Sequence, residues 1–170
     1  MKKITVILLW ILFGGLSVFF SFYPLDYLFT SEPIHIIFGG IALLIGWVQF
    51  IEKFRIKYMN IHRWIGKIYI SSILLSGIPG FYIALHASAG LSPKLGFGIG
   101  SIIWVTLAIL SYTSIRKGNV ILHKKYIMYN YAGTFCAVTL RLWLPLLINI
   151  FGEFALAYQV VAWLSWIPNM

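Results

Sequence analysis

The chain has 170 residues, of which 61% are hydrophobic and 10% are charged, and its formal net charge is +9. Soluble domains carry about 45–50% apolar and about 25% charged residues, so this composition excludes an ordinary soluble protein and is typical of a chain embedded in lipid. The positive charge follows from the membrane topology described below, and it requires no nucleic-acid partner.

Uncharged apolar runs follow one another along the whole chain. A membrane-spanning helix needs roughly 17–25 residues, and each of these runs is about that long. The sequence therefore predicts an all-α, polytopic integral membrane protein in which six spans form one bundle and one domain, residues 1–170. The expected spans are approximately 4–22, 34–51, 65–86, 96–115, 126–151 and 154–170.

The first run has features of a secretory signal, because a basic start and an apolar middle occur in MKKITVILLWILFGG. A cleavable signal has an apolar region of about 7–15 residues, followed by small residues at the cut site. Here the apolar run is longer and continues into the bulky stretch SVFFSFYPL. We therefore expect the first span to be retained.

The distribution of basic residues predicts the orientation. Counted by the predicted spans, the lysines and arginines lie almost entirely on one side, with Lys94 alone in a loop on the other side and Arg141 inside a span. An excess of Lys and Arg marks the cytoplasmic face, so both termini are predicted to be cytoplasmic. Three of the four acids, Asp26, Glu32 and Glu153, then lie outside.

This topology also predicts location and partners. We expect a multi-pass protein of a bacterial plasma membrane, surrounded by the lipid bilayer. Anionic lipid headgroups are expected at the basic face, since each basic residue near such a surface contributes about 1 kcal/mol of attraction. A second copy of the chain or another membrane protein stays open as a further partner.

The four histidines divide into two pairs by predicted depth. His62 and His123 open the third and fifth spans, and both therefore lie at the cytoplasmic face. His35 begins the second span and His86 ends the third, so this pair is expected at the outer face.

Small and polar residues follow three of these histidines at helical spacing. Residues at i, i+4, i+7 and i+11 share a face of a helix. Small residues let membrane helices approach closely, and polar residues need partners away from lipid, so we expect the three faces to meet in the bundle interior. They consist of His35, Gly39, Ala42, Gly46 and Gln49 in the second span, His62, Gly66, Tyr69, Ile73, Ser76 and Gly80 in the third, and His123, Asn130, Thr134, Ala137 and Arg141 in the fifth.

Arg141 has the clearest energetic argument for a role. An arginine near the centre of a span costs about 2.5–3.5 kcal/mol on the insertion scale. Such residues usually face a cavity or a partner and mark function, although a structural ion pair or a snorkelling side chain is the alternative. We expect Arg141 in the outer half of its helix, toward the level of His35.

Two further features predict packing and no chemistry. Gly96 and Gly100 have the small-xxx-small spacing of a helix-packing face. Cys136 is the only cysteine of the chain and lies inside the fifth predicted span, where a small apolar packing role is expected. The sequence contains no zinc motif of the HExxH type and no paired intramembrane carboxylates.

Four sequence blocks resemble a bacterial family of predicted membrane proteins catalogued as domain of unknown function 2306. The blocks are HIIFGGIALLIGWVQF, KYMNIHRWIGKIYI, HKKYIMYNYAGTFCAVTLRLWLP and AYQVVAWLSWIPN. The third block departs from the family pattern HxxWMxRxYA at Tyr126 and Tyr129, and His86 matches no motif position. The resemblance implies no activity. The positions that match the family pattern are His35, Gln49, Phe50, Arg55, His62, Arg63, Gly66, Tyr69, His123, Arg141, Pro168 and Asn169.

The first functional hypothesis is a transmembrane redox protein that binds haem b or a metal through histidines, since histidine is a common axial ligand of haem iron. His62 with His123 would form an inner site, and His35 with His86 an outer site in which Arg141 contacts a propionate. The inner polar cluster expected around the first site consists of Gln49, Arg55, Arg63, Tyr69 and Asn130.

Two other hypotheses remain open. The polar faces are also compatible with a transport pathway or a lipid or small-anion site, in which histidine titration near neutral pH couples protons. Alternatively, the interface histidines beside Arg63 and Lys124 bind lipid phosphates, and the protein is a non-catalytic assembly or structural subunit. Whether the protein is an enzyme is left open by the sequence.

Overall fold

The computed structural model describes residues 2–22 and 33–170. All regular elements of these residues are helical, as the composition predicted for an all-α membrane protein. The elements are α1 (Lys2–Phe22), α2 (Pro33–Gly46), the 3-10 helix η2 (Trp47–Phe50), α3 (Glu52–Lys57), α4 (Met59–Leu85), α5 (Leu91–Arg116), α6 (Val120–Thr134), α7 (Cys136–Phe151), α8 (Phe154–Leu164) and the 3-10 helix η3 (Ile167–Asn169).

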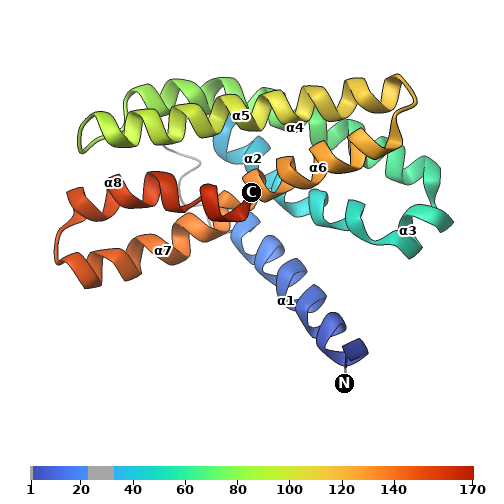
Figure 1. The fold of residues 1–170 in the computed structure, drawn as a ribbon, viewed down its shortest axis with the longest axis horizontal. Coiled ribbons are helices and arrows are strands. Elements are labelled where there is room, and N and C mark those ends of the chain that lie inside the picture. Colours follow the sequence, from blue (N-terminus) through green and yellow to red (C-terminus); the bar gives the residue numbers. More distant parts are fainter. Residues whose placement is uncertain (1, 23–32) are drawn as a thin grey trace.

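The long helices α4 and α5 lie side by side and antiparallel, and they form one layer of the molecule (Figure 1). Helix α2 packs on α4. Helix α6 packs on α5 and runs antiparallel to it, so α4 and α6 run in the same direction. Helices α7 and α8 form a hairpin at the opposite end of the bundle from α3. Helix α1 extends obliquely away from the other helices toward its N-terminal end (Figure 1).

Five helical segments of the described chain are long and apolar enough to cross a membrane, which supports a membrane location. The first four correspond to predicted spans. The fifth predicted span was expected to be one helix over 126–151, but the structure divides it at Phe135 into α6 and α7. The hydroxyl of Thr134 donates to the carbonyl of Asn130 one turn earlier, and this type of bond bends helices. The five segments are Thr5–Phe22, Pro33–Phe50, Met59–Leu85, Leu91–Arg116 and Val120–Phe151.

The region predicted as a sixth span, 154–170, contains α8 and η3. Helix α8 has 11 residues and rises about 16 Å at 1.5 Å per residue, about half of the 30 Å hydrocarbon core. The Nδ2 of Asn169 donates to Ala132 O and Thr139 Oγ1, at 3.3 and 3.1 Å, so the end of the chain lies at the junction of α6 and α7. Figure 1 shows the C-terminus in the middle of the bundle rather than at the end predicted to be cytoplasmic.

Helix α8 reaches this position because it packs between α5 and α7. A Cβ added to Gly96 would lie 3.0 Å from Ala162, and one added to Gly100 would lie 3.2 Å from Trp166 Nε1. The prediction that these two glycines form a packing face is therefore confirmed, and the face receives α8.

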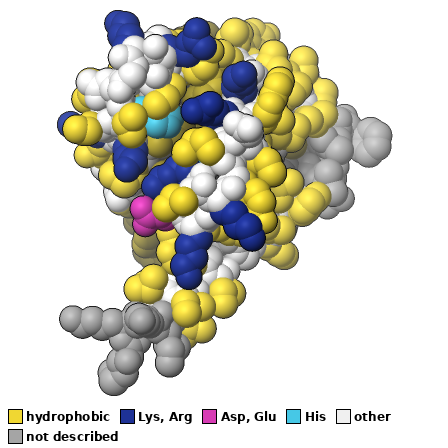
Figure 2. Space-filling model, turned by 90° about the vertical axis from the view of Figure 1, so that its right-hand side faces the viewer, with side chains coloured by type: hydrophobic (Ala, Val, Ile, Leu, Met, Phe, Trp, Pro, Cys, Tyr) yellow, Lys and Arg dark blue, Asp and Glu magenta, His cyan; other side chains and the backbone are white. Residues whose placement is uncertain are grey.

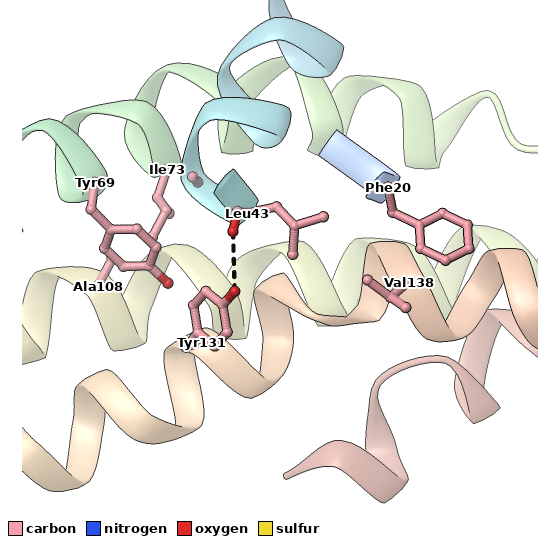
Figure 3. Packing of buried hydrophobic residues seen from close by; sticks show 8 residues of the cluster. Phe20, Leu43, Tyr69, Ile73, Ala108, Tyr131 and Val138 are labelled. Carbon is pink, nitrogen blue, oxygen red and sulfur yellow. Dashed lines mark hydrogen bonds between the residues drawn. The ribbon is translucent and has the colours of Figure 1, made fainter. Parts of the chain in front are cut away.

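The three faces of small and polar residues meet in the interior, as predicted. Tyr69, Ile73 and Tyr131 are almost fully buried beside Leu43. Figure 3 shows the Tyr131 hydroxyl directed toward α2, where it donates to Leu43 O at 3.1 Å. The same hydroxyl lies 3.0 Å from Ser17 Oγ, so one side chain joins α1, α2 and α6.

Basic side chains gather at one end of the bundle, which Figure 2 shows face-on. This end contains α3, the start of α4, the end of α5 and the start of α6 (Figure 1). Of the acids predicted on the other side, Asp26 and Glu32 lie outside the described residues. The N-in/C-in orientation stays a prediction. The exposed basic residues of these elements are Lys53, Lys57, Arg63, Lys67, Arg116, Lys117, Lys124 and Lys125.

Gly46 is the position where α2 comes closest to two tyrosine rings. A Cβ there would overlap the Tyr131 ring and lie 2.6 Å from Cε2 of Tyr69. We expect Gly46→Ala to lower stability by about 1–3 kcal/mol, the usual cost of overpacking, since both rings are held by hydrogen bonds. Thermal unfolding of the purified protein in detergent measures this effect. Gly15→Ala is the matched control, because no atom lies within 4 Å of a Cβ added there, and equal effects of the two variants would contradict the packing described.

Candidate functional site

His123 lies in the first turn of α6 and is held by a serine of α5. Its Nδ1 is 3.1 Å from the carbonyl oxygen of Ser111 and 3.0 Å from Ser111 Oγ. A carbonyl can only accept, so Nδ1 carries the hydrogen and donates it to Ser111 O. In the neutral ring the lone pair then belongs to Nε2. This is the arrangement in which protein-bound metals are usually ligated by histidine, with the other ring nitrogen fixed by a backbone carbonyl.

His35 is held in the same way on the other side of the molecule. Its Nδ1 donates to Ser76 O at 2.9 Å, and Ser76 Oγ donates back to His35 O at 2.9 Å. Ser76 belongs to the polar face that the sequence identified in the third span. Ser111 was missed because the fourth span contains no histidine from which a face could be traced; its only signal is its position 12 residues before His123, across a short turn.

A buried hydrogen-bond network fixes the register of α4 and α6. Tyr69 Oη donates to Asn130 Oδ1 at 2.7 Å and lies 2.9 Å from Thr134 Oγ1. Tyr69 is seven residues after His62, and Asn130 is seven residues after His123. Because the two helices run in the same direction, both histidines lie two turns before this bond and at the same level. His62 is accordingly close enough to His123 for their charges to interact.

His62 and two residues of η2 contain buried polar atoms without a partner in the part of the chain that the structure describes. Among the described residues, no hydrogen-bond partner exists for His62 Nδ1, Gln49 Nε2 or Trp47 Nε1. Gln49 is only 7% exposed, and its Oε1 lies 3.8 Å from a Cβ built on Gly66, one turn after His62. An unpaired polar group removed from water costs roughly 1–3 kcal/mol, so such a group in a native structure points to a ligand or to bound water.

The surroundings of the inner pair are strongly positive. Arg55 and Arg63 both interact electrostatically with His62, and Arg55 pairs with Glu52 at 3.5 Å. His62 and His123 are each the fourth residue of a helix, where the helix dipole adds positive potential. The inner polar cluster therefore favours a ligand with negative groups.

A cavity of about 880 Å³ lies in the half of the molecule that the sequence predicts to be the outer one. Its wall includes His35 and Arg141, the two residues that the sequence placed at a common level. The guanidinium of Arg141 donates through Nη1 to Ala137 O at 2.6 Å. Cys136 also lines this cavity, and its thiol donates to Ser165 Oγ at 3.3 Å, so it holds α7 against the end of α8.

His86 lies apart from this cavity and from His35. The ring of His35 packs on Gly80, and His86 is six residues farther along α4, about 9 Å of helix rise. His86 is exposed, its Nδ1 bonds to Tyr82 O at 2.9 Å, and its ring lies 4.4 Å from that of Tyr82. The structure thus places His62 and His123 at the same level, within range of electrostatic interaction, and it does not bring His35 and His86 together.

The comparisons with known proteins agree with the sequence blocks and the fold. No curated protein and no solved structure matches the chain. Residues 33–170, from the start of α2 to the last residue, match the family described as "Predicted membrane protein (DUF2306)". The chain therefore belongs to this family of predicted membrane proteins.

Proposed function

We propose that this protein is a membrane redox carrier that binds one b-type haem between His62 and His123. One observation carries the proposal: His62 and His123 lie at the same level on two parallel helices, and the buried Nδ1 of His62 has no hydrogen-bond partner among the described residues. The Nδ1 of His123 is occupied by Ser111, which leaves Nε2 for the iron. His62 and His123 would hold the haem iron, because histidine is a common protein ligand of haem iron.

A bare metal ion fits this site less well than a haem. Structural and catalytic zinc sites use three or four protein ligands, and no group of three or more His, Cys, Asp or Glu side chains suited to a metal exists among the described residues. The positive potential of Arg55, Arg63 and the two helix N-termini also opposes a cation. It suits the two carboxylates of a haem, which arginines bind through charge-assisted hydrogen bonds.

Each protein group has a defined role in this proposal. Bound haem iron supplies one-electron transfer between its ferric and ferrous states. Ser111 orients the His123 ring through Nδ1, and the Tyr69–Asn130 bond holds α4 and α6 in the register that keeps the two rings at one level. Arg55 and Arg63 would stabilise the carboxylates of a bound haem. We place the basic end at the cytoplasmic face of a bacterial plasma membrane, among anionic lipid headgroups.

The optical spectrum of the purified protein tests this function. The chain is expressed in cells supplied with a haem precursor, purified in detergent and titrated with haemin where it is isolated without haem. We expect a Soret band, sharp α and β bands on dithionite reduction, and one haem per chain by the pyridine haemochrome assay. A protein that stays colourless and shows no saturable change on haemin titration would exclude the proposal.

A further inference from the structure

The cavity described above lies apart from the proposed haem site, since neither His62 nor His123 contributes to its wall. Its volume of about 880 Å³ lies within the range of natural ligand pockets, which is roughly 300–1,000 Å³. Helices α1, α2, α4, α5, α6, α7 and α8 all contribute to the wall. The cavity is therefore a feature of the whole fold and not a gap at one helix contact.

The wall is mainly apolar, and several of its polar side chains already have partners inside the protein. Ser101 Oγ donates to a backbone carbonyl of α4, and Trp166 Nε1 donates to one of α8. His35 and Arg141 also interact with other groups of the chain, so we assign neither of them to a ligand. Because burying a charge is costly unless the charge is paired, this wall favours a neutral and largely apolar molecule.

The hydroxyl of Tyr158, a lining residue from α8, is not engaged in this way. Among the described residues it has no hydrogen-bond partner. The Tyr158 ring is stacked on Phe154, with ring centroids 5.2 Å apart, and it is tilted against Phe97 at 5.5 Å. Phe97 and Trp104 line the cavity as well. The cavity thus offers aromatic surface beside a hydroxyl donor.

We propose that this cavity binds a membrane quinone, with a ring carbonyl accepting from Tyr158 Oη and the isoprenoid tail along the apolar wall. The flat ring of a quinone suits the aromatic surface of Phe97 and Trp104, since such rings pack favourably in offset or edge-on arrangements. A buried carbonyl needs a donor, which the Tyr158 hydroxyl supplies. Leu140 and Leu144 extend the wall along α7 and offer surface to the tail. The proposal concerns binding alone and is independent of the haem site.

Titration calorimetry of the detergent-purified protein provides the test, with a decyl-substituted benzoquinone as the probe. We expect saturable binding of one quinone per chain, in haem-free and haem-loaded protein alike. Tyr158→Phe should weaken binding about fivefold, the usual effect of losing one neutral hydrogen bond. Tyr112→Phe is the matched control and should bind like the unaltered protein, because Tyr112 is 40% exposed and does not line the cavity.

A pair of leucines on α7 separates binding in the cavity from quinone that dissolves in the detergent or attaches to the outer surface. Leu144 lines the cavity, whereas Leu142 is 51% exposed and does not line it. Leu144→Trp fills part of the cavity and should abolish saturable binding, and Leu142→Trp should not. The proposal would be overturned by equal binding in the two tryptophan variants, by equal affinity for decanol and the quinone, or by equal affinities of Tyr158→Phe and Tyr112→Phe.

Discussion

Replacement of His123 by glycine is expected to abolish the Soret absorption of the purified protein, and free imidazole is expected to restore it. His123 is the better anchored of the two proposed axial ligands, because Ser111 fixes its ring through Nδ1. Loss of a group that merely orients a ligand costs about 10–100-fold in metal affinity, so loss of the ligand itself should cost at least as much. Glycine leaves a space that imidazole fills, and the recovered spectrum reports ligation directly. The measurement is a haemin titration with and without added imidazole.

Two other histidines serve as controls for this experiment. His86→Gly removes an exposed ring that contacts Tyr82 one turn earlier on the same helix, and it should leave haem binding unchanged. His62→Gly should reproduce the effect of His123→Gly, including the response to imidazole. The proposal would fail if His62→Gly and His123→Gly bound haemin with the affinity of the unaltered protein.

The helical nature of the chain and the interior faces of three helices were predictable from the sequence. Apolar runs of membrane length and small residues at helical spacing are local signals. They predicted that the faces containing Gly46, Tyr69 and Asn130 meet, and these three residues do lie together. The depth of His62 and His123 followed from counting spans. The two histidines lie at one level because His62 is seven residues before Tyr69 and His123 is seven residues before Asn130, which Tyr69 bonds.

Other features depend on tertiary contacts that a local pattern does not contain. The break at Phe135 has Gly133 two residues before it, but glycines also lie inside α2, α4 and α5 without ending them, and Pro145 lies inside α7 without ending it. The short α8 could not be distinguished from a span by hydropathy, because its place between α5 and α7 depends on Gly96 and Ala162 meeting. The sequence paired His35 with His86 because both were counted to one side, but helix phase turns His86 onto Tyr82.

Removal of the Asn130 side chain is expected to give the largest loss of stability among polar substitutions in the interior. Asn130 is fully buried, its Oδ1 accepts from Tyr69 Oη at 2.7 Å and its Nδ2 donates to Trp104 O at 2.7 Å. One side chain therefore joins α4, α5 and α6. Asn130→Ala leaves buried groups on two helices without this partner, which should cost about 1–3 kcal/mol. Unfolding of the detergent-solubilised protein by a graded denaturing detergent measures the change.

A double-mutant cycle shows whether the effect belongs to the Tyr69–Asn130 bond. Tyr69→Phe removes the hydroxyl alone, and the two changes together should be less harmful than their sum by about 0.5–1.5 kcal/mol, because residues that share a hydrogen bond are not additive. Asn149→Ala is the matched control and should have little effect, since Asn149 is an exposed asparagine of α7.

The same Asn130→Ala protein should also bind haemin more weakly, because the Tyr69–Asn130 bond keeps His62 and His123 at the same level. If the stability losses of Tyr69→Phe and Asn130→Ala were strictly additive and haemin affinity were unchanged, the Tyr69–Asn130 bond would have no role in positioning the two histidines.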